Sequence, residues 1–184
     1  MTGRPPYTFM FDLGSLPEKG AELALRPGLA ERAQIAAWLG IESLQRLEGS
    51  VKLSCGLSGR FHYRGHFDAD VVQACVITLE PVLSHLSQDF ERVLELVVPV
   101  SRHGRRGGKD SAPVATSLPD AGDDDAPERI DDPVIDLAAP LLEELSLSLD
   151  PYPRKAGASF TVPEDRVDNP ADNPFSVLQK LKRS

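Results

Sequence analysis

Hydrophobic positions in the first half of the chain change from a helical period to the period of strands. Residues 29–39 show helical spacing, and Gly40 follows as a C-terminal stop. The apolar residues on one face of this segment are Ala33, Ala36 and Leu39, with Ile35 and Trp38 beside them. Residues 7–17 indicate a short strand leading into a turn, and alternation dominates 43–82. The pattern therefore predicts a helix over 29–39 between strands.

The alternating region predicts neighbouring strands of an antiparallel sheet. Residues 43–55 carry leucines and valine with this period, and we interpret Gly49 among them as the mark of a bulge. A glycine-containing connection, typical of a hairpin, leads to residues 61–67, where aromatic and basic side chains alternate. Residues 69–79 are apolar on both faces, which predicts a central strand that contains Cys75.

Residues 83–98 fit two different periods. The side chains at helical spacing are Leu83, Leu86, Phe90, Val93 and Val97, whereas those that alternate as in a strand are Phe90, Leu94, Leu96 and Val98. We favour the strand, as the last member of an antiparallel meander.

A charged region separates this sheet from the rest of the chain. It begins with a basic run that contains Arg102, Arg105, Arg106 and Lys109. Residues 110–132 then hold eight acidic residues against Arg129 alone. So little apolar surface cannot offset the entropy cost of ordering the backbone. We therefore expect residues 101–133 to form a long, disordered and flexible insertion.

Two further helical patterns follow the insertion. Leucines over 137–148 fit a helix with Asp136 as a possible cap, and Pro140 is tolerated because it lies within the first turn. Near the C-terminus, Asn173 suits an N-cap and precedes an apolar stripe made of Phe175, Leu178 and Leu181. The cationic residues at the end of this segment are Lys180, Lys182 and Arg183. This stripe either folds back on the sheet or binds a partner.

Net charge limits the possible partners. The 184-residue chain carries a formal charge of −8, so bulk attraction to nucleic acid is excluded. Contact with RNA would therefore depend on the basic run and on the cationic C-terminal residues. The basic run is similar to Arg/Gly segments that touch single-stranded RNA, and the alternative is a solubilising linker. No signal peptide or membrane-length apolar run is present, so we expect a cytoplasmic protein.

Candidate chemistry is sparse. Cys75 is followed by Thr78 rather than by a second cysteine, and hydroxyls are poor ligands for soft metals, so we expect a small buried side chain and no metal. His62 and His66 share a strand face but lie about 13 Å apart, too far for one ion. Asp68 and Asp70 fit a paired carboxylate or, more commonly, a solvated strand. We find no enzyme signature and no cofactor or small-molecule motif.

Three segments together resemble the YceD family of large ribosomal RNA subunit accumulation proteins: "VVQACVITLEPV", "IDLAAPLLEELSLSLDPYPRKAG" and "NPFSVLQKLK". The resemblance extends from about residue 43, apart from the acidic linker. Many members carry C-x-R-C-L-x-P-V at the first segment, and some add a cysteine-rich stretch near the C-terminus, where this chain has "DPYPRKAG" without cysteine; such members are often called metal-binding. The positions that match here are Cys75, Leu79, Glu80, Pro81 and Val82, with Thr78 in place of the second cysteine. The resemblance thus implies a branch that lacks the metal.

These patterns predict a single α+β domain: an antiparallel sheet, as a meander or partly open barrel, over about 43–98, covered on one side by two helices. The resemblance implies a non-enzymatic factor in large ribosomal subunit biogenesis, with precursor ribosomal RNA or assembly proteins as partners. The alternative is a cytoplasmic protein–protein interaction module unrelated to ribosomes, which partner identity would distinguish. A metal- or thiol-dependent enzyme would instead need a bound metal or an accessible cysteine of low pKa.

Overall fold

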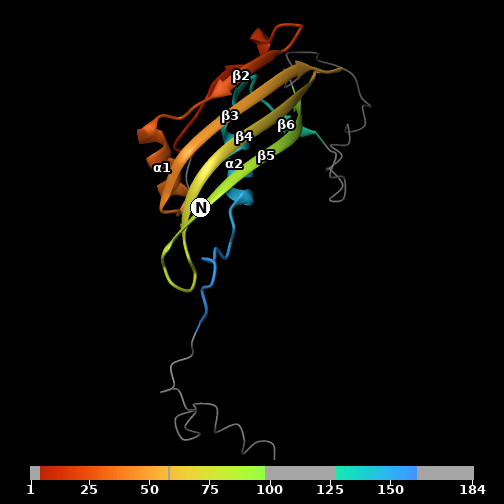
Figure 1. Cartoon of the computed structure of the whole chain (residues 1–184). Coiled ribbons are helices and arrows are strands. Elements are labelled where there is room, and N and C mark those ends of the chain that lie inside the picture. Colours follow the sequence, from red (N-terminus) through yellow and green to blue (C-terminus); the bar gives the residue numbers. More distant parts are fainter. Residues whose placement is uncertain (1–4, 58, 98–126, 161–184) are drawn as a thin grey trace, which may run out of the picture.

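The computed structural model describes residues 5–57, 59–97 and 127–160 (Figure 1). Its main sheet has five strands in the order β2-β3-β4-β5-β6. Their bounds are Ala21–Leu25 for β2, Ser43–Cys55 for β3, Arg60–Ala74 for β4, Pro81–Leu96 for β5 and Glu128–Ile130 for β6. Neighbouring strands are antiparallel except for β6, which runs parallel to the end of β5. The sheet is open and mainly antiparallel, which confirms the sheet expected for an α+β fold. The presence of β5 confirms the strand predicted at 83–98.

Two helices and a small second sheet complete the described fold. The helices are α1 (Leu29–Leu39) and α2 (Ala138–Ser148), and a 3₁₀ turn, η1, spans Leu13–Ser15. The second sheet pairs β1 (Met10–Asp12) with β7 (Val134–Asp136) in antiparallel register. The strand expected within 7–17 is therefore present, whereas β2, β6 and β7 were not predicted from the pattern.

Local sequence explains where both helices begin and end. The Glu31 carboxylate accepts a hydrogen bond from the Gly28 amide at 2.6 Å at the start of α1, and Gly40 ends it with a φ of 71°. Asp136 Oδ1 accepts from the amides of Ala138 at 3.0 Å and Phe9 at 2.7 Å. The N-cap position of α2 is held by Leu137 rather than by the expected Asp136, whose carboxylate instead ties the N-terminal segment to the first residue of the helix.

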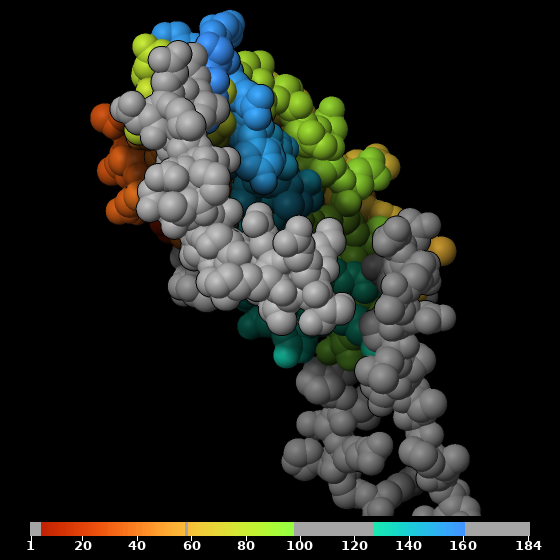
Figure 2. Space-filling view, turned by 90° about the horizontal axis from the view of Figure 1, so that it is seen from below, coloured from red at the N-terminus to blue at the C-terminus, as the bar shows by residue number. Residues whose placement is uncertain are grey.

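The core lies between one face of the sheet and both helices. Figure 2 shows α2 between the N-terminal part of the chain and β5. The fully buried side chains that meet there include Ile35 from α1, Val51 and Phe67 from the sheet, and Leu142 and Leu145 from α2. Tyr63 donates its hydroxyl hydrogen to the Leu137 carbonyl at 2.8 Å, so a buried polar pair joins β4 to the start of α2.

The place of Gly49 in the alternating pattern suggested a bulge, but β3 has no bulge at this residue. The register of β3 on β4 shifts between Leu44 and Arg46, and Gly49 itself pairs regularly with Phe67. A Cβ added at Gly49 would overlap the Leu141 side chain of α2. The absence of a side chain at Gly49 therefore leaves the space that the Leu141 side chain of α2 fills.

Two further expectations need correction. The strand predicted over 69–79 ends at Ala74, and residues 75–80 form the turn of the β4–β5 hairpin. The flexible insertion was placed at 101–133, but β6 lies within that range and hydrogen-bonds to β5. The rest of the expected insertion, residues 101–126, lies outside the described residues. Hydrogen bonds to β5 satisfy backbone amide and carbonyl groups of β6. The two strands are distant in sequence, so local composition does not reveal this pairing.

Candidate functional site

The turn that carries the family motif is closed by its own backbone. The amide of Cys75 donates to the Glu80 carbonyl, and the amide of Leu79 donates to the Cys75 carbonyl, both at 2.9 Å. The Glu80 amide also reaches the Thr78 hydroxyl oxygen at 3.4 Å. These bonds replace strand pairing beyond Ala74, and this is why the apolar run at 75–79 is a turn rather than a strand.

A segment distant in sequence packs against this turn. The Val76 amide donates to the Pro153 carbonyl at 2.9 Å, and the Lys155 amide donates to Cys75 Sγ at 3.4 Å. The Lys155 ammonium pairs with the Glu80 carboxylate at 3.0 Å. Residues 75–80 and 152–155 are the two segments in which the family resemblance places cysteines in other members. Here hydrogen bonds and an ion pair hold them together.

Cys75 is buried, as expected, but it lies outside the main core cluster. A hydrogen bond from the Thr78 side chain and bonds from the amides of Lys155, Thr78 and Ile77 stabilise the thiolate and lower the pKa of Cys75 to about 6. Thr78, which occupies the position of the second cysteine, therefore serves as a donor to the first. We name residues 75–80 with 152–155 the hairpin-turn site.

The hairpin-turn site presents apolar side chains to solvent. Leu79 is 75% exposed and has a φ of 60°, a backbone conformation that a leucine rarely adopts. Val76 and Tyr152 are also exposed large hydrophobic residues. Figure 1 shows the hairpin reaching past the ends of the neighbouring strands, beside the segment that follows α2. A strained, exposed leucine next to other exposed apolar groups is typical of a contact surface.

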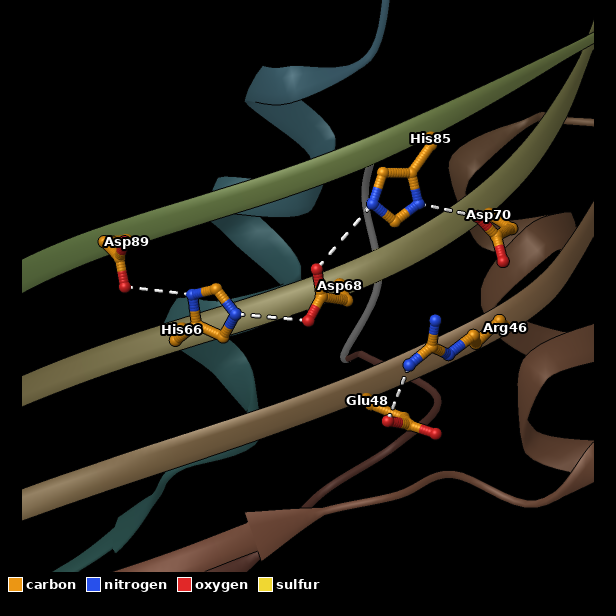
Figure 3. A network of polar contacts seen from close by, with 7 residues as sticks. All are labelled: Arg46, Glu48, His66, Asp68, Asp70, His85 and Asp89. Atoms are coloured by element: carbon orange, nitrogen blue, oxygen red, sulfur yellow. Dashed lines mark hydrogen bonds and ion pairs between the residues drawn. The ribbon is translucent and has the colours of Figure 1, made fainter.

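The outer face of β4 and β5, opposite the helices, carries a polar network (Figure 3). His66 bridges Asp89 at 2.9 Å and Asp68 at 3.2 Å, and His85 binds Asp70 at 2.7 Å. Partial burial lowers the pKa of His66, but the hydrogen bonds and charges of Asp68 and Asp89 outweigh it and raise the pKa overall. Alternation along one strand places His66, Asp68 and Asp70 on the same face, and the antiparallel register adds His85 opposite Asp70 and Asp89 opposite His66.

Basic side chains on the outer face are matched by acidic neighbours. Distances of 2.9 to 3.5 Å join the pairs Arg46–Glu48, Lys52–Glu22, Arg60–Glu95 and Arg64–Glu91. Three carboxylates also surround the two histidines of Figure 3. Phosphate groups would have to displace these paired carboxylates, so the described sheet face is poorly suited to RNA.

A hollow of about 320 Å³ lies on the helix side, between β6, β7 and α2. Arg92, one of two arginines that line it, is bound to Glu143 at 2.8 Å and Glu144 at 3.2 Å, with Glu128 at 3.9 Å. This compensation leaves Arg92 unsuited to hold an anionic small molecule. Within the described residues, no group of three or more His, Cys, Asp or Glu side chains could hold a metal ion.

The predicted RNA-contacting residues lie outside the described residues. They are Arg102, Arg105, Arg106, Lys109, Lys180, Lys182 and Arg183. The amphipathic segment that begins at Asn173 lies outside them as well. Among the helices of the described residues, none combines the length and apolar character needed to cross a membrane.

Comparison with protein families supplies the identity of this fold. The model of the large ribosomal RNA subunit accumulation protein YceD matches residues 63–182, which include the whole hairpin-turn site. The match begins later than residue 43, from which the resemblance was expected. Neither the curated proteins nor the solved structures include a match to this chain. Because the matched region spans more than half of its length, the chain belongs to the YceD family.

Proposed function

We propose that this protein is a non-enzymatic factor in large ribosomal subunit biogenesis that supports the accumulation or processing of precursor large-subunit ribosomal RNA. The observation that carries this proposal is the family match across residues 63–182. The family description links such chains to ribosomal RNA and names no catalytic step. The buried thiol of Cys75, held by backbone amides, suits a structural role in the turn.

The proposed contact with the assembly machinery is a protein contact at the hairpin-turn site. Support comes from the exposed side chains of Val76, Leu79 and Tyr152, which lie on and beside a turn closed by its own backbone hydrogen bonds. A preorganised turn loses little conformational entropy on binding. The chain's charge of −8 and the paired charges of the sheet face also favour a protein partner over direct RNA contact there.

Direct RNA contact, where it occurs, is proposed for the basic run and the cationic C-terminal residues. Alanine at Arg102, Arg105, Arg106 and Lys109 should weaken RNA binding and flatten its dependence on salt, because fewer counterions are then released. Binding that is unchanged at every salt concentration would remove the basic run from the interface.

The decisive experiment is a tagged pull-down from the native cell extract at low salt, with and without RNase, in which both protein and RNA are identified. Precursor large-subunit RNA or assembly proteins should be enriched, and RNase separates protein docking from an RNA bridge. Leu79→Asp should abolish the enrichment, whereas Leu57→Asp should not, because Leu57 is even more exposed but lies on the β3–β4 connection. Recovery of a ribosome-free partner alone would favour the unrelated interaction module.

A further inference from the structure

Strand β5 has an edge without a partner along most of its length. It pairs with β4 from Pro81 to Glu95, but on its other side β6 pairs only with residues 94–96. Among the described residues, no strand occupies the edge between 82 and 93. Natural sheets usually protect such an edge with lysine, proline, a bulge or a very short strand. Residues 82–93 contain no Lys or Pro, and the register of β5 on β4 is regular. The single arginine of this stretch, Arg92, is bound to Glu143 and Glu144 of α2.

We propose that this edge pairs with the β5 edge of a second copy of the chain, in antiparallel register centred on Gln88. The two five-stranded sheets would then form one continuous sheet about a twofold axis. Such a contact is isologous, so each residue pair occurs twice except the pair on the axis. The proposal is independent of the proposed function, because it rests only on the pairing and composition of β5.

The position of β6 sets the register. A partner strand on the open edge can extend only to Val93, because β6 pairs with the next residues, 94–96. An antiparallel partner that begins at Leu83 and ends at Val93 uses the whole open edge and places its centre at Gln88. A shift by one residue would place side chains of opposite faces across from each other, and the pleat forbids that.

This register sets apolar residues opposite apolar ones and places no two like charges opposite each other. On the outer face it sets Leu83 opposite Val93 of the second copy, and His85 opposite Glu91. On the helix side it sets Leu86 opposite Phe90, and Gln88 opposite itself. Apolar cross-strand pairs stabilise antiparallel sheets, whereas like charges directly opposite each other destabilise them. Leu83, which is 64% exposed in one copy, would be covered.

The first test is the mass of the full chain in solution, by sedimentation equilibrium over a wide range of concentrations. We expect a concentration-dependent dimer that Leu83→Lys weakens by about tenfold or more, because the lost apolar pair occurs twice and lysine protects edges. Leu147→Lys is the matched control, because Leu147 is similarly exposed but lies on α2. A chain that stays monomeric at all concentrations would overturn the proposal.

A second test reports the register and does not depend on the lysine variant. In a Cys55→Ser background, which removes the exposed native thiol, Gln88→Cys should form a disulfide-linked dimer under mild oxidation. Glu22→Cys, at the exposed opposite edge on β2, should not. Hydrogen exchange of the β5 amides should slow as concentration rises. A dimer that survives Leu83→Lys without the Gln88→Cys cross-link would place the interface elsewhere.

Discussion

The close approach of α2 to the sheet at Gly49 gives the sharpest quantitative prediction. In Gly49→Ala the new Cβ would overlap Leu141 Cδ1 of α2 and lie 3.5 Å from the Leu25 Cβ. Leu141 and Leu25 are both buried, so neither can move into solvent to make room. The helix or its side chains must shift, and α2 leads directly into the segment that closes the hairpin-turn site.

The expected loss of stability follows from two opposing effects. Overpacking a well-filled core costs about 1–3 kcal/mol, whereas alanine in place of glycine recovers about 0.4–1 kcal/mol by restricting the unfolded chain. Gly49→Ala should therefore lower the free energy of unfolding by about 0–2.6 kcal/mol. Leu141→Val, which removes the obstructing δ carbons, should by itself cost about 1 kcal/mol.

A double-mutant cycle measured by urea unfolding tests the steric cause. The double variant Gly49→Ala/Leu141→Val should be more stable than the sum of the single changes by about 1 kcal/mol or more, because the valine makes room for the new methyl group. Ser50→Ala, next along β3, is the matched control and should stay within about 0.5 kcal/mol of the parent. Additive single changes would refute the packing explanation.

Three further outcomes follow from particular contacts. Tyr63→Phe should cost about 1–3 kcal/mol in urea unfolding, because it leaves the buried Leu137 carbonyl without its donor; a loss below about 0.5 kcal/mol would contradict this. In a Cys55→Ser background, thiolate absorbance should give Cys75 a pKa of about 6. Thr78→Val should raise that pKa. The pKa of Cys75 in the folded chain lies below the ordinary value of 9.0, so between about pH 6 and 9 the folded chain binds fewer protons than the unfolded chain. The free energy of unfolding should therefore rise with pH across this range, and this contribution is lost as pH falls through 6. Leu79→Asn should stabilise the fold by about 0.5–1 kcal/mol in thermal unfolding, because asparagine tolerates the left-handed conformation.

The parts of the fold that local sequence encodes were predicted well. The helix over 29–39 has its stop signal at Gly40 within the same segment, and both bounds are confirmed. The helix expected over 137–148 begins one residue later, with Leu137 at the N-cap position and Asp136 accepting a hydrogen bond from the Ala138 amide. The strand at 83–98 could be chosen over a helix only by its place after other strands, and β5 confirms that choice.

The hairpin-turn site could be identified only in part. Its motif residues and the absence of a second cysteine are visible in the sequence, and so is the resemblance to the YceD family. The turn itself was mistaken for strand because an apolar run of this length fits both. Contact between Cys75 and Lys155 joins residues 80 positions apart, and no periodicity carries that information.

Sequence alone therefore determined the elements whose signals are local: helix caps, alternating strands, and a motif that indicates the family. Tertiary structure decided everything that depends on strand register and on packing across the core. It placed His85 beside Asp70, made Gly49 a point of helix contact and left the β5 edge open. The physical reason is that register and close packing are set by groups far apart in the chain, whereas caps and turns are set by neighbours.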